Sequence, residues 1–186
     1  MRLLLTIICL LTAGCDLIPK SHLEQVQSDG VLRVLTRNSA TTYYEGPFGS
    51  TGLEYDLAAG FANYLQVRLE IEVPDTLSQI LLDIQAGTAD MAAAGLTVTE
   101  ERKQLLNFSN SYQRITPQLV YRVGSRSPRN LGDLQGSFEV VANSSHAERL
   151  RGLQEEYPDM SFQENQQLEP EQLLNLVWEQ IIDYTV

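Results

Sequence analysis

The chain has 186 residues, of which 43% are hydrophobic and 20% are charged, a composition typical of globular proteins. Its formal net charge of −11 argues against nucleic acid and against an anionic lipid surface as partners. This overall charge does not exclude a local anion site built around a single arginine.

The first residues have the pattern of a secretory leader, since a positively charged start precedes an apolar run too short to span a bilayer. Residues 11–15, Leu-Thr-Ala-Gly-Cys, resemble a bacterial lipobox, in which the chain is cut before the cysteine and lipid is attached to its sulfur. An ordinary signal peptide that contains a cysteine is the alternative. We therefore expect a signal peptide over 1–14 and a lipid anchor at Cys15, on the periplasmic face of a bacterial membrane. The outer membrane is favoured, although Asp16 leaves retention at the inner membrane open.

The rest of the chain alternates between strand-like and helix-like segments after a tether and short helix over 15–29. The predicted strands are 31–36, 67–73, 91–94, 116–121, 138–142, 160–162 and 181–186. The predicted helices are 21–28, 54–65, 77–86, 131–136, 145–157 and 171–180. Such alternation predicts parallel sheets covered by helices, with ligands bound beyond the carboxyl ends of the strands.

A basic, turn-rich connector over 122–128 separates two alternating units. We place a domain boundary there, with a first lobe over 30–121 and a second over 122–186. The final strand has no following partner loop within the sequence, so we expect the second lobe to be incomplete and the chain to be a fragment.

Residues 95–102 have the features of an anion clamp. A strand ending at Gly95 lets another group approach the backbone closely, and Thr97 and Thr99 offer hydroxyls. Arg102 follows one helical turn on, with a planar fork of donors suited to a carboxylate. The spacing alone also fits a capped surface helix with a solvated arginine, so both interpretations stay open.

This stretch, Gly-x-Thr-x-Thr-x-x-Arg followed by Phe-Ser-x-x-Tyr, resembles a signature of the family 3 extracellular solute-binding proteins, and residues 52–57 resemble their other signature. The resemblance implies an α/β fold of the type II periplasmic binding protein kind, two lobes with mainly parallel sheets, with the second lobe truncated here. It also implies that Gly95, Thr97 and Arg102 hold the backbone groups of an amino acid ligand.

Five short segments together resemble a group of cell-wall lytic transglycosylases that join a solute-binding-like domain to a catalytic one. They are residues 32–39, 43–46, 54–57, 92–96 and 144–148. By this resemblance the chain binds or senses a ligand and biases a distant peptidoglycan-cleaving domain, and it carries no catalytic residues itself. A stand-alone lipoprotein of a polar amino acid ABC transporter and the sensor domain of a signalling protein are the alternatives.

Two places where the sequence differs from the family pattern guide the expected choice of ligand. Arg37 occupies a position where amino-acid-binding relatives often have an acidic residue for the ligand's ammonium group. Residues 142–143, Ala-Asn, stand where relatives commonly have Lys-Gly. A carboxylate-bearing cell-wall peptide or muropeptide therefore fits better than a free polar amino acid. Ser144 and Ser145 complete the expected site.

Two aromatic residues, Tyr43 and Tyr44, are either stacking surfaces for a sugar or peptide or partly buried loop residues. The only histidines, His22 and His146, are far apart and lack a nearby Cys or Asp/Glu cluster, so no metal or cofactor is expected. We expect no nucleic acid partner, and peptidoglycan as a partner only through the missing domain.

Overall fold

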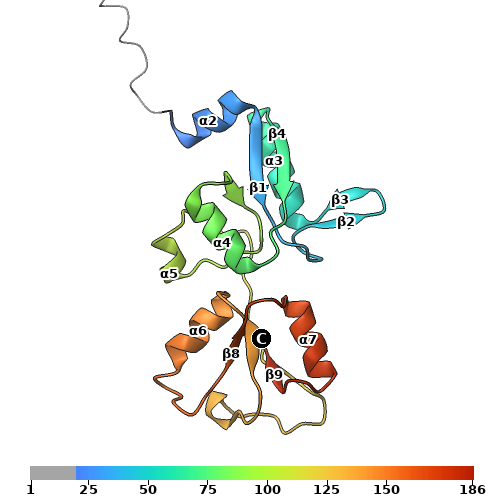
Figure 1. The fold of residues 1–186 in the computed structure, drawn as a ribbon, viewed down its shortest axis with the longest axis vertical. Helices are drawn as coiled ribbons and strands as arrows, with labels where there is room; N and C mark the ends of the chain where they lie inside the picture. The colour runs from blue at the N-terminus through green and yellow to red at the C-terminus, as the bar shows by residue number, and fades with distance from the viewer. Residues whose placement is uncertain (1–19) are drawn as a thin grey trace, which may run out of the picture.

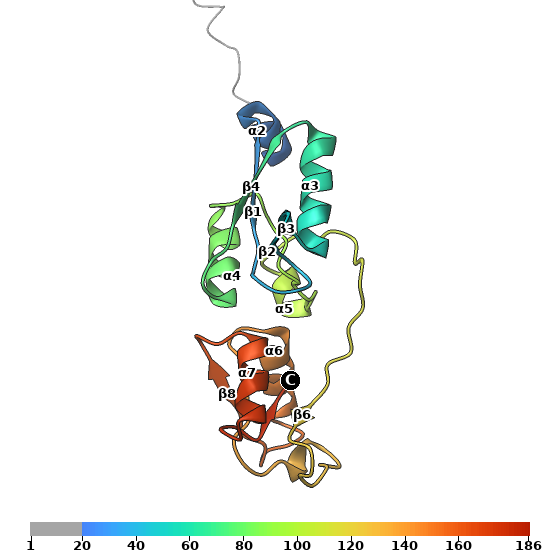
Figure 2. The same cartoon turned by 90° about the vertical axis from the view of Figure 1, so that its right-hand side faces the viewer.

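The computed structural model describes residues 20–186, so the predicted leader and Cys15 lie outside the described residues. Two groups of helices and strands are stacked along the long axis of the molecule (Figure 1). We call them lobe 1, residues 20–103, and lobe 2, residues 120–186. The segment 104–119 joins them and runs along one side of the molecule (Figure 2).

Lobe 1 is built on a parallel sheet of three strands in the order β4-β1-β5. Its strands are β1 (Val31–Leu35), β4 (Arg68–Glu72) and β5 (Met91–Ala92). Successive side chains of β1 point to opposite faces, and each face is covered by a helix. Val34 packs with Ala58 and Ala62 of α3 (Leu53–Leu65), and Leu35 packs with Ile80 of α4 (Leu77–Ala86).

Local signals explain where these helices begin and end. Ser21 caps α2 (His22–Asp29) in a capping box with Glu24, and Thr76 accepts a hydrogen bond from the first turn of α4. Gly87 closes α4 in the left-handed conformation that favours glycine. The strand 31–36 and the helices 21–28, 54–65 and 77–86 are therefore confirmed to within one residue.

Lobe 2 has two short pairs of strands, the parallel pair β7-β8 and the antiparallel pair β6-β9. These strands are β6 (Val120–Tyr121), β7 (Glu139–Val141), β8 (Gln163–Asn165) and β9 (Tyr184–Thr185). The short helix η1 (Leu131–Asp133) precedes β7, and α6 (Ser145–Leu153) and α7 (Pro170–Trp178) flank the strands (Figure 1). Buried Phe138, Val140 and Leu150 form a core with Met160.

Several predicted elements are wrong in extent. Residues 37–52, for which no strand or helix is predicted, contain the hairpin β2 (Tyr44–Gly46) and β3 (Gly49–Thr51). The strand expected at 160–162 begins at Gln163, because pairing with β7 fixes its position while Met160 turns into the core. The strands expected over 116–121 and 181–186 shorten to two residues each, and the helix over 145–157 ends at Leu153.

We predict that Gly52→Ala is far more damaging than Gly87→Ala, although both glycines have a positive φ. A Cβ at Gly52, where φ is +136°, would lie 2.2 Å from the carbonyl oxygen of Thr42, whereas a Cβ at Gly87 meets nothing within 4 Å. The expected losses of unfolding free energy are roughly 2–5 kcal/mol at Gly52 and about 1 kcal/mol at Gly87. Urea denaturation of both variants measures this, and equal losses would contradict the close packing.

Candidate ligand-binding site

A small cavity of about 100 Å³ lies between the lobes. It is lined by six of the residues selected from the sequence: Arg37, Gly95, Thr97, Arg102, Ser144 and Ser145. The lobe 1 residues follow the carboxyl ends of β1 and β5, and the two serines begin α6 of lobe 2. This is the edge at which parallel α/β sheets bind their ligands.

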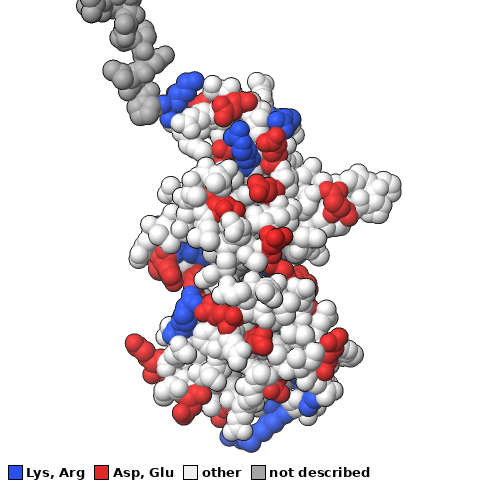
Figure 3. Space-filling model, viewed as in Figure 1, with Lys and Arg blue, Asp and Glu red and all other residues white. Residues whose placement is uncertain are grey.

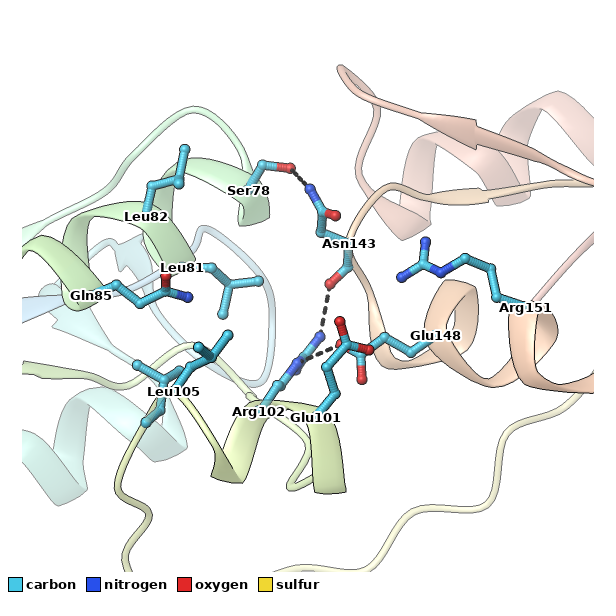
Figure 4. A pocket seen from close by; sticks show the side chains of 11 residues that line it. Ser78, Leu81, Leu82, Gln85, Glu101, Arg102, Leu105, Asn143, Glu148 and Arg151 are labelled. Atoms are coloured by element: carbon cyan, nitrogen blue, oxygen red, sulfur yellow. Dashed lines mark hydrogen bonds and ion pairs between the residues drawn. The ribbon is translucent and has the colours of Figure 1, made fainter.

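Arg102 is buried at this junction, with only 5% of its surface exposed. It belongs to the short helix α5 (Glu100–Lys103), which Thr99 caps. Its guanidinium donates from Nε to Oε1 of Glu148 at 2.8 Å, from Nη1 to the carbonyl of Thr97 at 3.2 Å and from Nη2 to the carbonyl of Asn143 at 2.8 Å. Figure 4 shows two of these bonds crossing from lobe 1 to lobe 2. Arg102 is therefore an interlobe side chain and is not solvated.

Asn143 forms the lobe 2 side of this contact. Its backbone is left-handed, with φ at +55°, a conformation that asparagine tolerates better than most residues. The side chain donates to the hydroxyl of Ser78 in α4 at 2.8 Å (Figure 4). Asn143 thus adds a polar contact between lobe 2 and lobe 1.

Two further contacts hold the lobes together. Arg37 forms an ion pair with Glu169, at the start of α7, and the hydroxyls of Ser145 and Thr97 lie 3.2 Å apart. Sites for small molecules typically enclose about 300–1,000 Å³, so the cavity between the lobes is smaller than a typical ligand site.

Gly95 has a left-handed backbone, with φ at +66°, and its N–H donates to both carboxylate oxygens of Glu54 at 2.8 and 2.9 Å. Glu54 is 6% exposed and also accepts a hydrogen bond from the hydroxyl of Tyr112. Burial, together with this bond, raises the pKa of Tyr112 above its usual value. The N–H of Gly95 is thus occupied within lobe 1.

The two tyrosines selected from the sequence do not line the interlobe cavity. Tyr43 donates its hydroxyl to Glu45, and its ring packs against Tyr55 with centroids 5.8 Å apart. Tyr44 is exposed on the hairpin strand β2. The structure does not bring these rings to Arg102.

The acidic partners Glu148 and Glu169 were not selected from the sequence. Glu148 lies one helical turn beyond Ser144, within a segment that carries the family resemblance, but nothing local indicates that it reaches Arg102. His146 lines the same cavity, and burial, with a smaller effect of Arg102, lowers the pKa of its imidazole. The neutral form of His146 is therefore favoured.

Two other cavities border the site. One of about 220 Å³ lies on the other side of Arg102, between Leu81 and Leu82 of α4 and the side chains of Glu148 and Arg151 of α6 (Figure 4). A wider one, of about 1020 Å³, lies between lobe 1 and the joining segment and includes Glu54 in its wall.

Acidic side chains are spread over both lobes on the face shown in Figure 3, with fewer basic ones among them. Within residues 20–186 there is no cluster of three or more His, Cys, Asp or Glu side chains that could hold a metal ion. None of the helices in this part of the chain is both long and apolar enough to span a bilayer.

Comparison with curated proteins finds long matches to one kind of enzyme. The membrane-bound lytic murein transglycosylase F of Saccharophagus degradans is 44% identical over 165 residues, which are 88% of this chain and 33% of that protein. The protein of the same name from Alcanivorax borkumensis is 47% identical, over 89% of this chain and 36% of its own length. The chain thus spans about a third of the length of the relatives it matches.

Comparison with solved structures finds the same two-lobed fold in amino-acid-binding proteins. An ancestral arginine-binding protein bound to arginine matches with a TM-score of 0.71 and 25% identity, covering 84% of this chain and 69% of that one. The holo arginine-binding protein of T. maritima matches with a TM-score of 0.74 and 21% identity, covering 87% and 70%. These matches confirm the predicted α/β fold of the periplasmic binding protein kind.

The profile described as "Bacterial extracellular solute-binding proteins, family 3" matches residues 32–169. This span runs from the second residue of β1 through the rest of lobe 1, including Arg102, and through lobe 2 as far as the residue before α7. The chain therefore belongs to the family 3 bacterial extracellular solute-binding proteins.

Proposed function

We propose that this chain is the ligand-binding part of a membrane-bound lytic murein transglycosylase, and that it recognises a carboxylate-bearing cell-wall peptide between its lobes. The names of the relatives, and the identity of 44–47% over nearly 90% of this chain, support the assignment. In such a protein the other two thirds of the length would hold the domain that cleaves peptidoglycan. Movement of the lobes on binding would then bias that domain.

The observation that carries this proposal is the position of Arg102. An arginine that is 5% exposed at a lobe junction is costly unless it is fully paired, and its partners here are one carboxylate and two carbonyls. The carboxyl end of a peptide offers the same kinds of acceptor. A planar guanidinium binds such an end through two parallel hydrogen bonds.

Charge pairing in the cleft favours a peptide over a free amino acid. A free amino acid needs an acidic partner for its ammonium group, and the two acids of the cleft, Glu148 and Glu169, are each paired with an arginine. A peptide carboxyl group needs only Arg102. The hydroxyls of Thr97 and Ser145, 3.2 Å apart across the cleft, can bond to its amides once the lobes part.

A free amino acid, delivered to an ABC transporter by a stand-alone lipoprotein, is the second candidate. One observation favours it: Oε2 of Glu148 is buried without a hydrogen-bond partner within residues 20–186, so it could accept from an ammonium group. The ancestral arginine-binding protein bound to arginine has the same fold. Titration with arginine and glutamine, beside a cell-wall stem peptide, separates the two candidates.

Arg102→Ala should weaken binding of a synthetic stem peptide by about one to two decades. A hydrogen bond to a charged group contributes roughly 1.5–3 kcal/mol, and a factor of ten corresponds to about 1.4 kcal/mol. Arg102→Lys should recover only part of the affinity, because an ammonium group does not reproduce the planar fork. Calorimetric titration of the purified protein measures both.

The matched control is Arg68→Ala, which removes an exposed arginine paired with Glu70 on the sheet of lobe 1 and should leave affinity unchanged. The carboxyl-amidated stem peptide should bind wild type as weakly as the free peptide binds Arg102→Ala. Unchanged affinity after both amidation and Arg102→Ala would refute the carboxylate site.

The leader pattern leads to a further expectation, that Cys15 carries lipid and holds the protein at the periplasmic face of the outer membrane. Cells that express wild type and Cys15→Ser, grown with radiolabelled palmitate, test it. Label should enter wild type alone, and separation of inner and outer membranes should place that label in the outer fraction. Label in neither protein would exclude the anchor.

A further inference from the structure

Residues 122–129, which we call the basic turn, connect β6 to η1 in lobe 2 and do not line the interlobe cavity. These eight residues include Arg122, Arg126 and Arg129 and no acidic residue. Lobe 2 as a whole has 11 acidic and five basic residues. The basic turn is therefore a positively charged segment on an otherwise acidic lobe.

The three arginines of the basic turn form no ion pair within residues 20–186, and all three side chains are exposed. Basic side chains gather at the lower end of the molecule in Figure 3. The arginines that are paired in this part of the chain are Arg33, Arg37, Arg68, Arg102 and Arg151. The guanidinium groups of the basic turn are thus available to an external acceptor.

Hydrogen bonds hold the basic turn in shape near both of its ends. The hydroxyl of Tyr121 donates to Oγ of Ser127 at 2.9 Å, and the N–H of Arg129 donates to Oδ2 of Asp133 at 3.1 Å. Gly124 has a φ of +88°, a conformation that glycine adopts without strain in a tight turn. A partner that binds these arginines therefore has to order less backbone than it would on a free tail.

The basic turn and residue 20 lie at opposite ends of the long axis of the molecule (Figure 1, Figure 2). The expected lipid attachment, Cys15, comes five residues before residue 20. With lipid on Cys15, the basic turn is at the end of the molecule remote from the attachment. The net charge of −11 also opposes binding to an anionic lipid surface. Both observations favour a partner other than a membrane.

The carboxyl groups of cell-wall peptides suit this surface chemically. A planar guanidinium binds a carboxylate through two parallel hydrogen bonds. One exposed ion pair of this kind is weak. A polymer that repeats its carboxyl groups can engage several arginines at once, so the weak contacts reinforce one another. A single soluble peptide lacks this advantage.

We propose that the basic turn binds the peptide carboxyl groups of polymeric peptidoglycan, an inference that rests on the proposed function of the chain. The cleft recognises the carboxyl end of one peptide, and the basic turn holds the chain on the polymer. The sequence led us to expect peptidoglycan as a partner only through the missing domain. The basic turn adds a contact within this chain.

The test is sedimentation of the purified protein with isolated peptidoglycan sacculi. A variant that combines Arg122→Gln, Arg126→Gln and Arg129→Gln should bind sacculi about tenfold more weakly than wild type, because three exposed ion pairs are lost together. Each single substitution should weaken binding about two- to threefold. Binding of wild type should disappear in 1 M salt, where the Debye length is about 3 Å.

The matched control combines Lys20→Gln, Arg114→Gln and Arg149→Gln, which are exposed and form no ion pair within the described residues. This control changes the net charge by the same amount and should bind sacculi as wild type does. Sacculi whose carboxyl groups have been converted to amides should bind wild type as weakly as untreated sacculi bind the basic-turn variant.

Soluble stem peptide, added at a concentration that saturates the cleft, separates this inference from the proposed function. Binding to sacculi through the basic turn should persist in its presence. Equal affinity of wild type and the basic-turn variant for sacculi would overturn the inference. Complete release by the soluble peptide, or binding to vesicles of anionic lipid in place of sacculi, would overturn it as well. Failure of the proposed function gives another result, in which the cleft binds no stem peptide while the basic-turn variant still loses affinity for sacculi.

Discussion

The guanidinium of Arg102 is the point at which the two lobes meet, and the arrangement of the cleft depends on how it is paired. The side chain extends from lobe 1 and donates three hydrogen bonds, two of which are accepted by residues of lobe 2. Because a buried arginine cannot give up its charge, some acceptor must always occupy it. In this structure the acceptors are Glu148 and the carbonyl groups of Thr97 and Asn143. Under the proposed function, the carboxylate of a ligand would bind the same guanidinium.

Other pairs of side chains also connect the two lobes across the cleft. Arg37 and Glu169 form a second pair across the lobes, and Ser78 with Asn143 adds a neutral contact. Both contacts join residues of lobe 1 to residues of lobe 2. Glu54, by contrast, binds the N–H of Gly95 within lobe 1, so this contact does not depend on lobe 2.

Much of the fold could be predicted because its signals are local. Gly87 ends α4 and alternating apolar residues mark β4, each within a few positions of the element it defines. The buried face of α3 could not be predicted: Ala58 and Ala62 face the sheet, while larger Phe61 and Tyr64 are exposed. The site residues likewise include one that a local sequence signal indicates and one that it does not. A signature within eight residues led to Arg102, but its partner Glu148 lies 46 residues away and is set by the packing of the lobes.

A crystal structure of the protein with a bound stem peptide tests the account most directly, because it reveals which acceptor occupies Arg102. We predict that the carboxylate of the peptide accepts hydrogen bonds from the guanidinium of Arg102. A complex in which the peptide binds without contact to Arg102 would contradict the account.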